Sequence, residues 1–150
     1  MKISQLLLLS LLLLTMACAR SNYQDGNNDN RNPANANQDS TCALQLTQTN
    51  LCVDLIWDHR PTETDYGSFT LEFYDPSDRT RFIDPSQTLE VQLWMPSMGH
   101  GSSPVKIDRV DVGQYRVSNV FFTMHGTWDI QIRLKNGNVV VDQVAQSYNF

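Results

Sequence analysis

The chain has 150 residues, of which 41% are hydrophobic, and its 11 basic and 16 acidic side chains give a formal net charge of −5 at pH 7. That length is sufficient for one domain with a hydrophobic core. No run of basic residues is present to neutralise phosphates, so composition and charge exclude nucleic acid as an expected partner.

The chain begins with MKISQLLLLSLLLLTMAC, which has the composition of an export signal. One lysine precedes a leucine-rich stretch that is too short for an ordinary membrane span, which is typical of a signal peptide over residues 1–17. Ala17 before Cys18 resembles the cleavage site of bacterial lipoproteins, although Thr15 stands where that family usually has leucine. The resemblance implies that Cys18 is lipidated and anchors an exported protein to a lipid bilayer of the bacterial cell envelope, facing the periplasm or the exterior. An ordinary signal cleaved nearby is the alternative.

Residues 18–40 are rich in Asn, Asp and Gln and show no apolar periodicity. Such a segment does not bury enough apolar surface to offset its ordering entropy, so we expect a disordered tether. If Cys18 carries the lipid, Cys42 and Cys52 are left as a pair in the domain expected over residues 41–150. A pair in an exported protein favours a disulfide over a metal site, because no paired CxxC motif accompanies it.

From residue 41 onward, apolar and polar residues alternate in short runs separated by turn residues, which predicts half-buried antiparallel strands. Asn136-Gly137 between two apolar runs is a strong hairpin signal, because both central residues of a type I′ turn need positive φ. This rhythm is typical of an immunoglobulin-like antiparallel β-sandwich of seven or eight strands, so the predicted fold class is all-β. The expected strands cover residues 43–46, 51–58, 68–75, 88–95, 104–110, 114–122, 127–135 and 138–147.

Two segments between expected strands, LWMPSMGHGSSP and VFFTMHGTW, hold every methionine that follows the signal peptide. Thioether sulfur binds Cu(I) well and hard ions poorly, and imidazole binds either oxidation state of copper. If the two loops meet at one end of the sandwich, Trp94 or Trp128 would shield an ion there from water. The candidate copper ligands are Met95, Met98, His100, Met124 and His125.

MPSMGHGSSPV, followed by GQY and VFFTMHGTW, resembles the YtkA-like domain, which is related to the FixH-like proteins of the bacterial envelope. The similarity covers about residues 66–135. It implies an immunoglobulin-like sandwich and a role in copper handling or cytochrome oxidase assembly. His125 stands where relatives commonly have proline, so the resemblance assigns it no role. The residues that match the family pattern are Met95, Pro96, Met98, Gly99, His100, Met124, Gly126 and Trp128.

Two functions in different classes follow from these features. The first is a membrane-tethered envelope protein that binds copper, as Cu(I), for copper homeostasis or for delivery to a copper-accepting protein in cytochrome oxidase assembly. The alternative is a metal-free protein-interaction module of the envelope, in which the methionines fill core gaps or shape turns; another ligand for the two loops also stays open. We expect no enzyme, because no serine stands beside a plausible base and Cys42 and Cys52 are expected to be paired.

Overall fold

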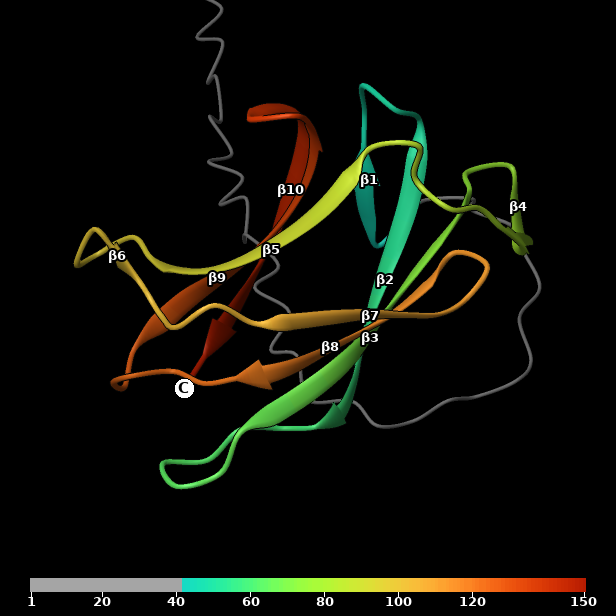
Figure 1. Cartoon of the computed structure of the whole chain (residues 1–150). Helices are drawn as coiled ribbons and strands as arrows, with labels where there is room; N and C mark the ends of the chain where they lie inside the picture. Colours follow the sequence, from blue (N-terminus) through green and yellow to red (C-terminus); the bar gives the residue numbers. More distant parts are fainter. Residues whose placement is uncertain (1–41) are drawn as a thin grey trace, which may run out of the picture. The chain divides into compact units, whose positions relative to one another are not determined.

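A computed structural model describes residues 42–150, which form strands and no helix (Figure 1). Within these residues no segment is therefore a helix able to cross a bilayer. The expected signal peptide, Cys18 and the tether over residues 18–40 lie outside the described residues. The strands are β1 (Leu44–Leu46), β2 (Leu51–His59), β3 (Gly67–Asp75), β4 (Asp78–Phe82), β5 (Thr88–Met95), β6 (His100–Gly101), β7 (Lys106–Asp111), β8 (Gln114–Val120), β9 (Thr127–Asn136) and β10 (Val139–Asn149).

The strands make two antiparallel sheets. One sheet has the order β1-β2-β3-β8-β7 with β4 paired to β3, and the other has the order β10-β9-β5-β6. The predicted all-β, antiparallel sandwich is confirmed. The predicted hairpin connects β9 to β10, but Asn136 pairs with Val139, so the two turn residues are Gly137 and Asn138. Only Gly137 has a positive φ (59°), so the turn is not the predicted type I′ turn, which needs positive φ at both central residues.

The core lies between the sheets and follows the period of two read from the sequence. From Trp128 to Leu134, every second residue of β9 is at most 1% exposed, while the residues between them are partly exposed. The same alternation buries Val91, Leu93 and Met95 on β5 of the same sheet. β3 and β8 of the facing sheet add buried aromatic and aliphatic side chains. The largest fully buried side chains are Trp128, Phe69, Phe73, Phe122, Leu46, Leu71, Ile130, Ile132 and Leu134.

The described residues contain ten strands, where the sequence predicts seven or eight. The sequence of β4, DRTRF, has no apolar alternation because the strand is exposed along most of its length and covers no core. β6 has only two residues, which are held in register by β5. Both strands owe their pairing to a neighbour, so local pattern does not indicate them.

The two lateral edges of the sandwich are held differently. On one side, the disulfide between Cys42 and Cys52, with Cα atoms 5.2 Å apart, confirms the predicted pair and ties β1 to β2. The carboxylate of Asp142 on β10 accepts hydrogen bonds from the backbone N–H groups of Gln48 (2.9 Å) and Thr49 (2.8 Å) in the β1–β2 turn. On the other side, among residues 42–150, β7 is the edge strand of its sheet, and β5 has an unpaired edge along most of its length because β6 is so short.

Candidate metal centre

The first methionine-containing loop is a tight hairpin between β5 and β6. Met95 and His100 are direct cross-strand partners, so their side chains lie on the same face of the hairpin. The N–H groups of Met98 (3.2 Å) and Gly99 (2.9 Å) donate to the carbonyl of Met95, and Gly99 adopts φ 66° to close the turn. The hairpin therefore fixes Met95 and His100 together and leaves Met98 at its tip.

The second loop connects β8 to β9 and turns at residues 123–126. Gly126 exchanges two backbone hydrogen bonds with Phe150 (2.9 and 3.0 Å), which fixes the end of the loop beside the end of β10. Because the chain turns here, the strict alternation of a strand does not apply to Met124 and His125. Figure 1 shows this connection and the β5–β6 hairpin on the same side of the sandwich.

Trp128, the second residue of β9, joins the two loops. Its ring is completely buried and packs edge-on against the ring of His100, with centroids 5.8 Å apart. Its indole N–H donates a hydrogen bond of 3.0 Å to the carbonyl oxygen of Met124. One side chain thus contacts a histidine of the first loop and the backbone of the second.

Two further contacts hold the loops against each other. A Cβ built on Gly126 would lie 2.5 Å from the terminal methyl carbon of Met95, so this methionine packs directly on the glycine of the opposite loop. The hydroxyl of Ser102, just after β6, donates a hydrogen bond to the carbonyl of Phe121, just after β8. The two segments that the sequence marks as sulfur-rich therefore meet at one end of the sandwich.

The hydrogen bond of His100 leaves one ring nitrogen open. Nδ1 lies 3.2 Å from the carbonyl oxygen of Gly101, and a carbonyl only accepts, so in the neutral ring Nδ1 carries the proton. Nε2 then keeps its lone pair. A ring that donates one N–H to a backbone carbonyl while the other nitrogen stays free is oriented as metal-binding histidines commonly are.

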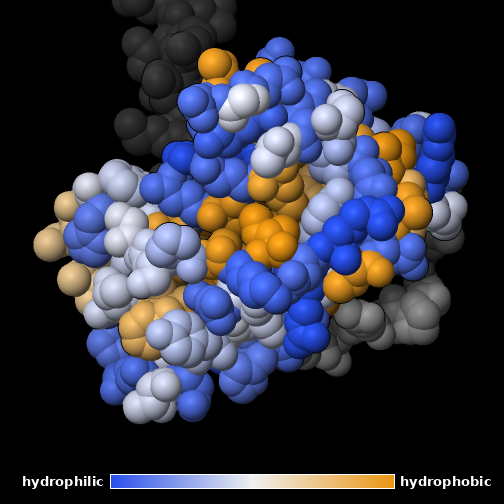
Figure 2. Space-filling view, viewed as in Figure 1, coloured by the Kyte–Doolittle hydropathy of each residue, from blue (hydrophilic) through white to orange (hydrophobic). Residues whose placement is uncertain are grey.

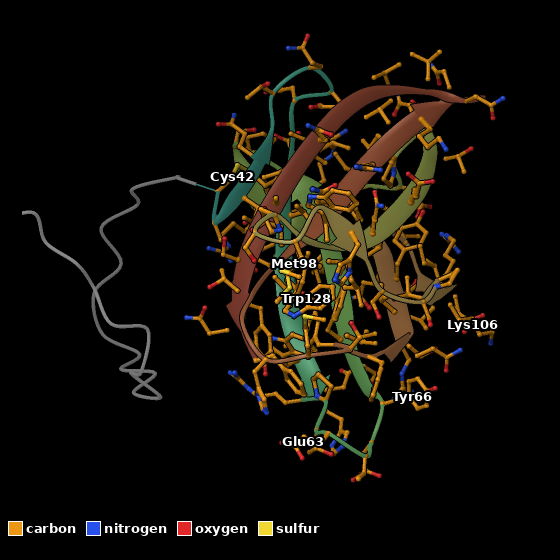
Figure 3. The ribbon with its side chains drawn as sticks, turned by 90° about the vertical axis from the view of Figure 1, so that its left-hand side faces the viewer. Cys42, Glu63, Tyr66, Met98, Lys106 and Trp128 are labelled. Carbon is orange, nitrogen blue, oxygen red and sulfur yellow. A yellow bond between two sulfur atoms is a disulfide. The ribbon has the colours of Figure 1, made fainter. Side chains whose placement is uncertain are left out.

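The three methionines differ in exposure. Met95 is 2% exposed and belongs to the core cluster, whereas Met98 and Met124 are 59% and 40% exposed. A thioether on the surface is available to an ion without unfolding, while that of Met95 lies beneath the loops. Figure 3 looks onto this end of the domain, with Met98 and Trp128 labelled.

His125 is engaged elsewhere. Its Nε2 lies 3.0 Å from Oε1 of Glu63, and its ring stacks on Phe150 at 5.4 Å. Glu63 comes from the β2–β3 connection, and nothing in its local sequence indicated a contact with the second loop. A hollow of 240 Å³ beside this pair is lined by Glu63, Phe121, Phe122, Thr123, Met124, His125 and Phe150.

Of the two candidate shielding tryptophans, only Trp128 faces the loops. Trp94 precedes Met95 and therefore points to the opposite face of β5, where it stands across from Gly101. Within residues 42–150, no three side chains of His, Cys, Asp or Glu gather closely enough to hold an ion. A metal at this end would therefore need sulfur from the methionines.

Comparison with known protein families gives a match. The model of a family described as YtkA-like matches residues 47–133, which is more than half of the chain and includes both loops. Neither a search of curated proteins nor one of solved structures finds a match. The family and the disulfide together indicate an exported protein of the cell envelope.

Proposed function

We propose that this chain, which belongs to the YtkA-like family, binds Cu(I) where its two methionine-containing loops meet. The observation that carries the proposal is the position of Trp128, which packs on His100 and hydrogen-bonds the carbonyl of Met124. Loops held together in this way present soft donors from two distant parts of the chain to one ion.

The donor chemistry supports copper over harder ions. Two exposed thioethers, Met98 and Met124, and the free Nε2 of His100 are soft and borderline ligands, which suit Cu(I). Met95 lies beneath the site and is the candidate for a fourth donor. His125 is directed to Glu63, so in this proposal it flanks the site and is not one of its ligands.

We further propose that the protein is held at the envelope membrane by a lipid on Cys18 and passes copper to an accepting protein, in copper homeostasis or cytochrome oxidase assembly. It is a carrier and not an enzyme in this proposal. Acyl chains on one cysteine would hold the domain near a bilayer while the Asn-rich segment separates the two. Replacing Cys18 by serine should release the protein from the membrane fraction; unchanged membrane association would contradict the anchor.

The copper proposal is tested by titrating purified mature protein against a Cu(I) chelator under reducing conditions. We expect about one Cu(I) to be bound, and the double variant Met98→Leu/Met124→Leu to lose it. Leucine keeps the volume and apolarity, so the variant should lose less than about 1.5 kcal/mol of stability. The matched control is Val110→Leu/Val112→Leu, which changes two side chains of similar exposure and should keep wild-type affinity.

Equal Cu(I) affinity in wild type and the methionine variant would contradict the proposal. So would the absence of binding in wild type. Either result would favour the metal-free interaction module as the function of the domain.

A further inference from the structure

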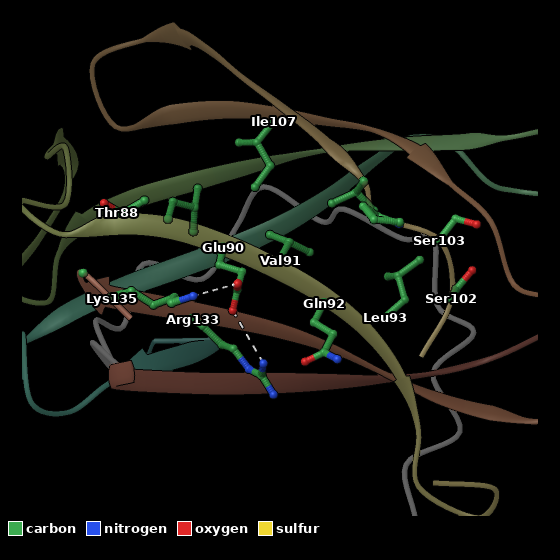
Figure 4. Close-up of a pocket in the computed structure, with 14 residues that line it drawn as sticks. Thr88, Glu90, Val91, Gln92, Leu93, Ser102, Ser103, Ile107, Arg133 and Lys135 are labelled. Atoms are coloured by element: carbon green, nitrogen blue, oxygen red, sulfur yellow. Dashed lines mark hydrogen bonds and ion pairs between the residues drawn. The ribbon is translucent and has the colours of Figure 1, made fainter. Parts of the chain in front are cut away.

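A hollow of 520 Å³ opens between the two sheets and shares no residue with the methionine and histidine donors. Figure 2 shows apolar side chains exposed at the bottom of this opening, near the middle of the face in view. Its walls come from β5 and from the segment that leads into β7 (Figure 4). The apolar residues that line it are Leu89, Val91, Leu93, Val105 and Ile107; we call it the β5–β7 groove.

Both strands beside the groove have a free backbone edge. β5 pairs with β9 from Thr88 to Trp94, but β6 covers the other edge of β5 only at Trp94 and Met95. Among the strands that the structure describes, β7 pairs only with β8. After β6 the chain leaves this sheet through Ser102–Pro104, so the place beside the rest of β5 is empty within residues 42–150.

The free groups of β5 can be assigned from one hydrogen bond. The carbonyl of Leu93 accepts from the N–H of Ser102 at 3.1 Å, so Leu93 directs its backbone groups to the β6 side. Backbone direction alternates along a strand, so Leu89 and Val91 direct their N–H and C=O groups to the same open edge. The side chains of Leu89, Val91 and Leu93 share the inward face.

The charges beside the groove favour an acidic ligand. Glu90 on the outer face of β5 is bound by Lys135 (3.0 Å) and Arg133 (3.5 Å), and the hydrogen bond from Lys135 lowers the pKa of Glu90, which stays ionised at neutral pH. The lining residues carry two positive charges, on Arg133 and Lys135, and one negative charge, on Glu90, so their net charge is +1. The Nε of Arg133 is also buried without a hydrogen-bond partner. The whole chain, in contrast, carries −5, so a second copy is disfavoured as the occupant.

We propose that the β5–β7 groove binds an extended acidic segment of another protein, which continues the line of β6 and pairs antiparallel with Thr88–Gln92. An extended strand supplies backbone partners to Leu89 and Val91, and its alternate apolar side chains fill the groove over Val91 and Ile107. Its carboxylates lie on the outer face of the sheet, which also carries Glu90, Arg133 and Lys135 and on which the cations outnumber the anion. The site is independent of copper.

The test uses purified mature protein and a blocked hexapeptide in which valine and glutamate alternate. In amide hydrogen exchange followed by NMR, the peptide should slow the amides of Leu89 and Val91, which face the open edge. The amides of Glu90 and Gln92 already face β9 and should not change. Saturation of these effects with peptide concentration gives the affinity.

The charge of the peptide and two variants complete the test. A peptide alternating valine and lysine should bind about three- to fivefold more weakly, and Arg133→Gln/Lys135→Gln should remove this difference. Ile107→Gln should weaken binding of the glutamate peptide, whereas Val110→Gln, at an exposed position of the same strand, should not. If Ile107→Gln fails to fold, the hydrogen exchange of Leu89 and Val91 in the wild-type protein still shows whether the peptide pairs with β5.

Three results would overturn the proposal. The first is the absence of saturable binding of the glutamate peptide. The second is binding that perturbs the groove without protecting the amides of Leu89 and Val91, which indicates an apolar ligand and not an added strand. The third is protection of the same amides without peptide together with dimers in sedimentation, which makes a second copy the occupant. The variant Met98→Leu/Met124→Leu should bind the peptide as wild type does.

Discussion

The indole nitrogen of Trp128 lies 3.0 Å from the carbonyl oxygen of Met124, and this hydrogen bond fixes the second methionine-containing loop to the first strand residues of β9. The same ring packs on His100 from the other loop. Because Trp128 is completely buried, it has no alternative partner in water, and the bond holds both loops in one arrangement. The spacing of the proposed ligands therefore depends on a residue that contributes no ligand atom.

Replacing Trp128 by phenylalanine should remove this hydrogen bond while keeping an aromatic ring in the core. We expect a loss of about 2 kcal/mol from the cavity and the lost bond, and a drop of at least about tenfold in Cu(I) affinity, as for other residues that orient metal ligands. The control is Phe122→Leu, which removes a buried ring in contact with Trp128 but keeps the indole N–H. Equal losses of affinity in both variants would show that core packing alone matters.

Replacing Gly126 by alanine should strain the meeting point of the loops. Gly126 has φ 140°, which side-chain-bearing residues rarely adopt, and the added Cβ would meet the methyl of Met95 at 2.5 Å. We expect a destabilisation of about 1–3 kcal/mol. In a double-mutant cycle with Met95→Val, which lacks the terminal methyl, the two changes should couple by about 0.5 kcal/mol or more. Additive unfolding free energies would mean that this contact carries no energy.

The fold was largely predictable because alternation of apolar and polar residues directly reports which face of a strand is buried. The strands with a buried face, such as β5 and β9, were found close to their observed bounds. The methionine loops were found because soft donors are rare in this chain and cluster in two segments. Their meeting at Trp128 depends on which strands are neighbours, and no local pattern encodes that.

The contact between His125 and Glu63 shows the same limit at the site. Glu63 lies in a polar turn before β3 and stays largely exposed beside His125, and nothing in its sequence neighbours indicates this contact. Likewise, the free edges of β5 and β7 follow from the strand order of the sheets, which alternation does not determine. Sequence therefore indicated the two methionine-containing loops but neither the carboxylate beside His125 nor the β5–β7 groove.

Removing the disulfide should destabilise the domain without altering the candidate centre. Cys42→Ser/Cys52→Ser frees the start of β1, and the chain-entropy estimate for a loop of this length gives a loss of about 2–4 kcal/mol. Chemical denaturation of the variant and of reduced wild-type protein should give matching losses. A variant as stable as the oxidised wild type would mean that the bridge is not formed in the exported protein.

Asp84 should make the folding stability of the domain depend on pH in the acidic range. Its carboxylate accepts hydrogen bonds from Arg109 (2.7 and 3.0 Å), from the Gly113 N–H and from the Tyr115 hydroxyl. These bonds, chiefly the one from the Arg109 guanidinium, hold the pKa of Asp84 well below its usual range. A depressed folded pKa means that the stabilisation is full above the unfolded pKa of about 3.9 and is lost as the pH falls through the folded pKa.

Melting temperatures of wild type and Asp84→Asn between pH 7 and pH 2 test this directly. The variant should melt lower at pH 7, and the difference should shrink as the pH falls below about 4. Asp108→Asn, which removes only an exposed pair with Lys106, should change stability by no more than about 1 kcal/mol. A difference for Asp84→Asn that stays constant over the whole pH range would contradict the ionised network.

The central claim, that the two loops form one Cu(I) site, is tested most directly by NMR of protein with ¹³C-labelled methionine methyl groups. After the expected signal peptide the chain contains only Met95, Met98 and Met124, so each signal can be assigned with a single leucine variant. The account predicts that one equivalent of Cu(I) shifts the methyl signals of Met98 and Met124 in parallel, with the ring signals of His100 shifting at the same ratio of copper to protein. Signals of Met98 and Met124 that stay unchanged, or that titrate at different ratios, would contradict a shared site.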